Sequence, residues 1–231
     1  MHKNSYNKME WFKKTYLANF DKLNILDIGS LDGKGDFNYS TIFNEPNWTY
    51  TGLDIQGGNN VKIVVTDIYN WLEVEDKSYD VIISGQFFEH LEFFWLTMSE
   101  IERVLRPGGF LCLIVPSAGP KHGGNMLNCY RFHEDGLKAM AKYVDLDVLH
   151  ASVDDNPNAN PWNDACLVAR KSGTLSSTIN AKNITEKDIG KYSGKDIKNV
   201  PKKDNDNNVL ESRVDNLECK LDLILDAINK K

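Results

Sequence analysis

Short apolar runs alternate with helix-forming segments throughout residues 22–171 of this chain. Seven of the runs have the length and composition of buried strands, and they span 23–28, 48–55, 61–65, 79–84, 110–116, 146–152 and 164–170. Helix patterns lie near 6–20, 37–43, 91–105 and 134–144. Strands interleaved with helices at this spacing predict an α/β fold with a seven-stranded, mostly parallel sheet covered on both faces. Because the last two runs are close together, we expect the last strand to be antiparallel.

The charge balance limits the classes of partner. The 231 residues include 27 basic and 33 acidic side chains, a net charge of −6, which disfavours a dedicated nucleic-acid or membrane-surface binder. The longest apolar stretches are far shorter than the roughly 18 residues of a membrane span, and the first residues lack the apolar core of a signal peptide. We therefore expect a cytoplasmic protein. Its four scattered cysteines indicate reduced structural thiols.

A change of composition near residue 171 predicts the end of the first domain, which spans 1–171. Residues 172–208 are polar and are expected to form a linker. Within 209–230, apolar residues recur at alternating spacings of 4 and 3 positions, at Leu210, Val214, Leu217, Leu221, Ile224 and Ile228. This heptad pattern predicts a coiled-coil helix that makes the protein a homo-oligomer. An amphipathic helix packed on its own domain is the alternative.

Polar residues follow the first three expected strands in an ordered series. Asp27 and Gly29 lie at the first turn, where glycine lets the backbone approach a ligand closely. Asp54 ends the second strand, where a carboxylate can accept hydrogen bonds from both hydroxyls of a ribose. Asp67 and Ile68 follow the third strand and can hold an adenine. The glycine spacing at the first turn is not that of a dinucleotide site. The series predicts an adenosine site without a pyrophosphate cradle, and helix capping is the alternative.

Residues 22–171 resemble the class I S-adenosylmethionine-dependent methyltransferases, which have a Rossmann-like fold. The resemblance rests on the ordered segments ILDIGSLDG, GLDI, VTDIYNW, YDVIISGQFFEHL and VLRPGGFLCLIVP. It implies that S-adenosylmethionine is the cofactor. Its implied contacts are Asp27, Gly29 and Ser30 at the methionine part, Asp54 with Ile55 at the ribose, Asp67 and Ile68 at the adenine, and Ser84 and Gln86 on the sulfonium side. Leu31 departs from the pattern, because many members of the family carry glycine there.

A narrower resemblance concerns the acceptor. The segments FFEHLEFFWLTMSEIERVLRPGG and VPSAGPKHGGNMLNCYRFHEDGLKAMAKYVDLDVL are similar to bacterial methyltransferases of capsule and surface-polysaccharide synthesis. This similarity implies O-methyl transfer to a hydroxyl of a sugar or nucleotide sugar, although Asn128 stands where the pattern has an aspartate. A methyltransferase for another small molecule, including an amine, is the second interpretation. A non-catalytic assembly module on the same fold is the third.

Two histidines follow neighbouring strands of the expected sheet. A sugar hydroxyl has a pKa far above neutral, so its methylation requires a group that accepts the proton. His90 and His122 are the candidate general bases, because both follow strands that end at the same edge. Tyr130 offers a further route for the proton. Histidines that cap a helix or close a loop are the alternative.

The same histidines could instead hold a metal. His90 and His122 with a carboxylate would form a 2-His-1-carboxylate site for iron, manganese or magnesium. The candidate carboxylates are Glu89, Asp155 and Asp164. We favour Asp164, because its position just before the last strand lets it face the same edge of the sheet as the histidines. Such a metal would lower the pKa of a bound sugar hydroxyl.

Three further residues are candidates for acceptor binding. Lys121 and Arg131 lie after the fifth strand, and Arg131 could pair with the pyrophosphate of a nucleotide sugar. Trp162 offers an apolar platform for the face of a sugar. For Arg131, an ion pair with Glu134 or Asp135 is the alternative.

Overall fold

A computed structural model describes residues 3–33, 38–122, 126–154 and 161–175. Its elements are the helices α1 (Lys3–Phe12), α2 (Phe94–Val104) and α3 (Glu134–Tyr143), a π-helical turn η1 (Lys13–Leu17), the 3-10 turns η2 (Tyr39–Thr41) and η3 (Phe88–His90), and the strands β1 (Asn24–Ile28), β2 (Thr49–Asp54), β3 (Ile63–Val64), β4 (Tyr79–Gly85), β5 (Leu105–Pro116), β6 (Leu146–Val153) and β7 (Asp164–Lys171). The predicted coiled-coil helix at 209–230 and most of the predicted linker lie outside the described residues.

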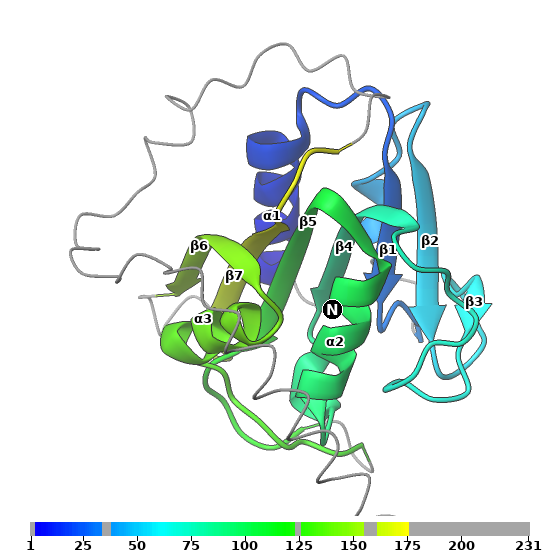
Figure 1. The fold of residues 1–231 in the computed structure, drawn as a ribbon. Coiled ribbons are helices and arrows are strands. Elements are labelled where there is room, and N and C mark those ends of the chain that lie inside the picture. Colours follow the sequence, from blue (N-terminus) through cyan, green and yellow to red (C-terminus); the bar gives the residue numbers. More distant parts are fainter. Residues whose placement is uncertain (1–2, 34–37, 123–125, 155–160, 176–231) are drawn as a thin grey trace, which may run out of the picture. The chain divides into compact units, whose positions relative to one another are not determined.

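The seven strands form one sheet in the order β3-β2-β1-β4-β5-β7-β6, shown in Figure 1. The pairs from β3 to β5 are parallel, and β7 is antiparallel to both β5 and β6. The expected seven-stranded, mostly parallel sheet with an antiparallel last strand is confirmed. The chain runs outward from β1 to β3 and then returns to β4 on the other side of β1, so the topological switch point lies between β1 and β4.

Each face of the sheet has its own apolar core. On one face, Leu26 and Ile28 of β1 pack in a cluster with residues of α2 and α3. On the other face, Ile25 belongs to a cluster with Met9 and Phe12 of α1. Figure 1 shows α2 and α3 on the near side of the sheet and α1 behind it. Side chains of one strand alternate between the faces, so burial on both sides explains why the central strands are continuously apolar.

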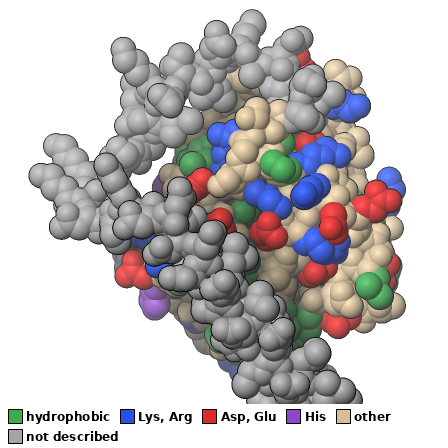
Figure 2. Space-filling view, in the orientation of Figure 1, with side chains coloured by type: hydrophobic (Ala, Val, Ile, Leu, Met, Phe, Trp, Pro, Cys, Tyr) green, Lys and Arg blue, Asp and Glu red, His purple; other side chains and the backbone are tan. Residues whose placement is uncertain are grey.

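Acidic and basic side chains are interspersed on the face that carries α2 and α3 (Figure 2). Arg103 pairs with Asp76 at 2.6 Å and with Glu100 at 2.6 Å, and Lys171 pairs with Glu102 at 2.7 Å. Neighbouring carboxylates therefore compensate the charges of Arg103 and Lys171 on this face. Among the described residues, no helix is long and apolar enough to cross a membrane.

Two segments differ from the sequence prediction. The helix expected at 37–43 is a single 3-10 turn at Tyr39–Thr41 in the described residues, where the Asn38 side chain accepts a hydrogen bond from Ser40 N. β5 begins directly after α2, and it includes Pro107 and Gly108 rather than following them. Gly108 has a φ of +79°, a conformation that glycine adopts without strain, so the chain turns within the start of the strand.

The connection between β3 and β4 is held by one buried indole rather than by a helix. Trp71 is fully buried, and its Nε1 donates to the Ile68 carbonyl at 2.8 Å. The Arg103 guanidinium of α2 donates to the carbonyls of Trp71 and Val74, each at 2.9 Å. This arrangement ties the loop that follows β3 to α2.

Substitution of Trp71 tests this anchor. Trp71→Ala should lower the free energy of unfolding by about 3 to 5 kcal/mol, since it leaves a large cavity and removes a buried hydrogen bond. The exposed neighbour Leu72 provides the matched control, because Leu72→Ala should change stability by less than about 0.5 kcal/mol. Urea unfolding of both variants measures the difference. Equal losses in the two variants would show that the indole is not the anchor.

Candidate functional site

The candidate site lies where β1, β2, β4 and β5 end, at one edge of the sheet. In open α/β sheets, ligands bind outside the carboxyl ends of the strands near the switch point. Gly29 follows β1 with a φ of +73°, and its N–H donates to the Leu53 carbonyl at 2.9 Å. A Cβ at this position would lie 2.3 Å from the Phe87 ring, so only glycine fits the turn.

Asp54 has its carboxylate oriented by two backbone groups at the end of β2. Leu31 N donates to one oxygen at 3.1 Å, and Gln56 N donates to the other at 3.1 Å. The side chain is buried, whereas the next residue, Ile55, is exposed. A fixed carboxylate beside an exposed apolar side chain fits a ribose with its adjoining base.

The other residues predicted to contact the cofactor differ in their exposure to solvent and in their hydrogen bonds. Asp67 is exposed and accepts a hydrogen bond from Tyr69 N at 2.8 Å, whereas Ile68 is buried in the core. Ser30 and Ser84 are also buried, and their hydroxyls donate to the carbonyls of Asn60 and Ile28. Asp67 is therefore open to a ligand, and the two serines support the turns.

Asp27 is a buried carboxyl at the end of β1. It accepts a short hydrogen bond from the Tyr50 hydroxyl, which in turn accepts one from Asn60 Nδ2 at 2.9 Å. Burial raises the pKa of Asp27 from 3.8 to about 7; the Tyr50 hydrogen bond opposes this rise, and the charge of Asp54 adds to it. Asp27 therefore titrates near neutral pH in the folded protein.

This shifted pKa predicts a pH dependence of stability. The folded protein keeps a proton on Asp27 that the unfolded chain releases above pH 3.8, so the stability from this group is full at low pH and is lost as the pH rises through about 7. Asp27→Asn removes the titration, so this variant should gain stability relative to the wild type between about pH 4 and pH 8. Urea unfolding across this range measures the gain.

Asp147 on β6 offers the control for that experiment, because it is exposed at the far edge of the sheet. The stability difference between Asp147→Asn and the wild type should change little with pH. If the difference between Asp27→Asn and the wild type is equally flat, the buried acid at β1 does not titrate as described.

Glu89, His90 and His122 form a compact cluster at the ends of β4 and β5. The Glu89 Oε1 atom lies 3.6 Å from His90 Nε2 and 3.9 Å from His122 Nε2. One ligand atom from each residue lies within 4.8 Å of the others, so the three could hold a metal ion. The two histidines that the sequence predicts as partners are thus brought together.

Asp164, the carboxylate favoured for the metal from sequence, has other partners. It is buried at the start of β7, where it accepts hydrogen bonds from Asn4 Nδ2 at 2.8 Å and Gln86 Nε2 at 3.1 Å. It does not belong to the group that contains the histidines, in which Glu89 supplies the carboxylate. Gln86, which the sequence predicts on the sulfonium side of the cofactor, therefore forms a hydrogen bond with β7. Asp155 lies outside the described residues.

The residues predicted for the acceptor line the loop after β5. The Tyr130 hydroxyl donates to the Glu92 carbonyl at 2.7 Å. Arg131 donates to the carbonyls of Gly119, Pro120 and Tyr130, and its guanidinium lies 6.0 Å from the Trp162 ring centroid. Arg131 therefore braces this loop instead of forming the ion pairs considered with the following helix. Lys121 is exposed in the same loop.

Trp162 connects the acceptor side to the histidine cluster. Its ring centroid lies 4.4 Å from that of His122. A Cβ on Gly119 would lie 2.3 Å from the indole, which therefore packs closely on the backbone. The indole thus forms a wall beside His122.

Tyr50 and Asn60 are site residues that sequence reasoning missed. Both contact the first turn, since Asn60 Nδ2 also donates to the Ser30 carbonyl at 3.0 Å. A signal for this close packing was the glycine inside β2: a Cβ on Gly52 would lie 1.8 Å from the Asn60 carbonyl oxygen.

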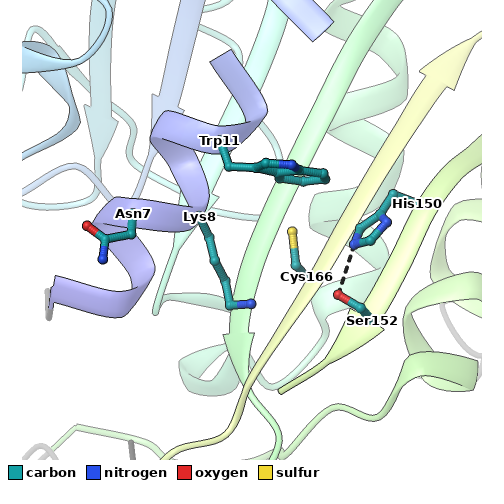
Figure 3. A pocket seen from close by; sticks show the side chains of 6 residues that line it. All are labelled: Asn7, Lys8, Trp11, His150, Ser152 and Cys166. Atoms are coloured by element: carbon teal, nitrogen blue, oxygen red, sulfur yellow. Dashed lines mark hydrogen bonds between the residues drawn. The ribbon is translucent and has the colours of Figure 1, made fainter. Parts of the chain in front are cut away.

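A separate hollow of about 370 Å³ lies between α1 and the β6–β7 side of the sheet (Figure 3). Its lining includes Trp11 of α1, Cys166 of β7, and His150, whose Nε2 lies 2.9 Å from Ser152 Oγ. No residue predicted for the cofactor or the acceptor lines this hollow. The candidate site is therefore the carboxyl edge of the sheet.

Comparison with known proteins agrees with this location. Residues 26–113 match the family model described as a methyltransferase domain. The match runs from β1 to β5 and covers less than half of the chain. The matched segment contains Asp27, Asp54 and the Glu89–His90 pair. No curated protein matches the chain.

Solved structures share the fold at low sequence identity. The 1,6-didemethyltoxoflavin N1-methyltransferase of Burkholderia thailandensis, solved with 1,6-didemethyltoxoflavin and S-adenosylhomocysteine, is 14% identical, with a TM-score of 0.58 over 73% of this chain and 79% of that one. Phosphoethanolamine N-methyltransferase 2 of Haemonchus contortus, solved with S-adenosylmethionine, is 15% identical, with a TM-score of 0.53 over 72% and 53%. The [4+2]-cyclase SpnF is 15% identical, with a TM-score of 0.54 over 73% and 81%.

Proposed function

We propose that this protein transfers the methyl group of S-adenosylmethionine to a hydroxyl of a sugar or nucleotide sugar in surface-polysaccharide synthesis. The observation that carries the proposal is the Glu89–His90–His122 cluster at the ends of β4 and β5, next to the strand ends of a methyltransferase domain. A hydroxyl acceptor needs such a group to take its proton. The resemblance of residues 87–109 and 115–149 to polysaccharide methyltransferases supports a sugar as acceptor.

The residues of the domain fit the cofactor. When bound, S-adenosylmethionine supplies an activated methyl group with a good leaving group. Asp54 would accept hydrogen bonds from the ribose hydroxyls, because backbone N–H groups fix both of its oxygens. Ile55 and Asp67 are exposed beside it for the base. Gly29 would form the tight turn beside the methionine part, with the Phe87 ring packed against it.

The histidine cluster would manage the acceptor proton. As the acceptor oxygen forms its bond to the methyl carbon, its proton would pass to His90 or His122. Both imidazoles face the buried Glu89 carboxylate, which would stabilise the positive charge that results. Trp162, next to His122, would pack against the face of the sugar.

An amine acceptor is the second candidate function. Two of the structurally similar proteins are N-methyltransferases, one for a toxoflavin precursor and one for phosphoethanolamine. The similarity to a [4+2]-cyclase shows that the fold by itself does not determine the reaction. Only assays with chosen acceptors therefore separate hydroxyl from amine methylation, and either from a non-catalytic module.

We also propose, from sequence alone, that residues 209–230 form a coiled coil that joins copies of the chain. The localisation in the cytoplasm is a prediction of the same kind. Light scattering on the full chain and on a variant that ends at residue 175 would measure the change in oligomeric state.

The enzymatic proposal is tested by screening nucleotide sugars against small amines and recording S-adenosylhomocysteine release. With the preferred hydroxyl acceptor, His90→Ala and His122→Ala should each lower turnover by roughly 10²-fold to 10⁴-fold, since each removes part of the proton-accepting cluster. His133→Ala is the control, because this histidine is exposed at the start of α3 and should leave turnover unchanged. If only amines are methylated, the proposed sugar methylation is wrong and the protein is an amine methyltransferase.

A further inference from the structure

We propose that Glu89, His90 and His122 bind one divalent transition-metal ion. The three residues come from two segments, η3 and the loop after β5, which the parallel pairing of β4 with β5 brings together. Two imidazole nitrogens and one carboxylate oxygen form a recurrent set of protein ligands, with positions left open for water or substrate.

The distances suit an ion at the centre of the cluster. Ligand atoms that each lie about 2.1 Å from a tetrahedral ion are about 3.4 Å apart. Glu89 Oε1 lies 3.6 Å from His90 Nε2 and 3.9 Å from His122 Nε2, which is too long for direct hydrogen bonds. Small rotations of the side chains would bring all three atoms within bonding distance of one ion.

The hydrogen bonding of His90 determines which of its nitrogens can bind a cation. His90 Nδ1 lies 2.5 Å from the Leu127 carbonyl oxygen, and a carbonyl only accepts hydrogen bonds. Nδ1 therefore carries the proton, and in the neutral ring Nε2 presents a lone pair toward Glu89. A lone pair that faces a carboxylate oxygen is repelled by it, and a metal cation bound between them would remove that repulsion. Metal-binding histidines commonly donate their other N–H to a backbone carbonyl in this way.

The exposure of the three side chains leaves one side of the site open. The Glu89 side chain is 0% exposed, whereas those of His90 and His122 are 11% and 31% exposed. A divalent ion would add positive charge beside this buried carboxylate, which favours its ionised form. The exposed edge of His122 would leave room for an acceptor oxygen on the ion.

The composition of the site selects the class of metal. Imidazole nitrogen favours zinc and the other transition metals, whereas magnesium prefers an all-oxygen environment. We therefore expect Zn²⁺ and Co²⁺ to bind and Mg²⁺ to bind much more weakly. If the proposed function is correct, on which this role rests, the ion would bind the acceptor hydroxyl and lower its pKa. His90 and His122 would then act as ligands in place of general bases, and the proton would pass to solvent.

Calorimetric titration of the full chain with Zn²⁺, after removal of metals by a chelator, tests the site. We expect one ion per chain. His90→Ala, His122→Ala and Glu89→Gln should each weaken Zn²⁺ binding by at least about a hundredfold, because loss of a direct ligand exceeds the 10-fold to 100-fold cost of losing an outer partner. His122→Ala changes a partly exposed loop residue, so it remains informative if Glu89→Gln fails to fold.

His133→Ala and Cys129→Ser are the controls, because each removes an exposed side chain that can bind zinc outside the cluster. Both should keep wild-type affinity, and Co²⁺ should show an absorption spectrum without thiolate charge transfer. The proposal is overturned if the wild type binds neither Zn²⁺ nor Co²⁺, or if a folded His90→Ala or His122→Ala variant binds like the wild type. Because metal titration needs no methyl acceptor, the metal site can be confirmed even if the proposed function is wrong. The proposed function can likewise be confirmed even if no metal binds.

Discussion

The parallel pairing of β4 between β1 and β5 determines where the side chains of the site lie. Ile28 of β1 is in register with Ser84, and Gly85 is in register with Ile114 of β5. The three strands therefore end at one edge, where the turn after β1 faces the segments after β4 and β5. The proposed cofactor residues therefore lie on the β1–β2 side of this edge, and the Glu89–His90–His122 cluster lies on the β4–β5 side.

Several buried carboxyl groups lie at the edge of the sheet where these strands end. Asp27, Glu89 and Asp164 are all buried near the strand ends, and each has a polar neighbour from another segment of the chain: Tyr50, His122 and Asn4. Burial of such groups costs free energy, which the hydrophobic cores on both faces of the sheet must offset. Titratable groups with shifted pKa values cluster at functional sites more often than elsewhere, and Asp27 follows this trend.

The strands could be predicted from sequence because their signal is local. A run such as Phe110–Pro116 is apolar at every position, and this identifies a strand buried on both faces without knowledge of its neighbours. The prediction of a helix at 37–43 was wrong, because Tyr39, Ile42 and Phe43 pack in the core from a single 3-10 turn and the residues directly after it. The sequence pattern alone does not distinguish an α-helix from a single 3-10 turn in this segment.

The site could be predicted only in part. His90 and His122 follow neighbouring strands, so their proximity could be inferred from topology. Glu89 is one of the three candidate carboxylates, but the sequence does not reveal that the turn at η3 brings it together with His90 and His122. Asp164 was favoured on its place before β7, but its partner Asn4 lies 160 positions away, and such a contact depends on how α1 packs.

Calorimetric titration of S-adenosylmethionine into Asp54→Ala tests most directly the proposal that the end of β2 binds the ribose of this cofactor. The account predicts saturable binding to the wild type and a loss of about 1.5 to 3 kcal/mol in the variant, since hydrogen bonds to a charged group contribute in that range. The exposed Asp147→Ala variant should bind like the wild type. Unchanged affinity in a folded Asp54→Ala protein, or no binding to the wild type, would contradict the account.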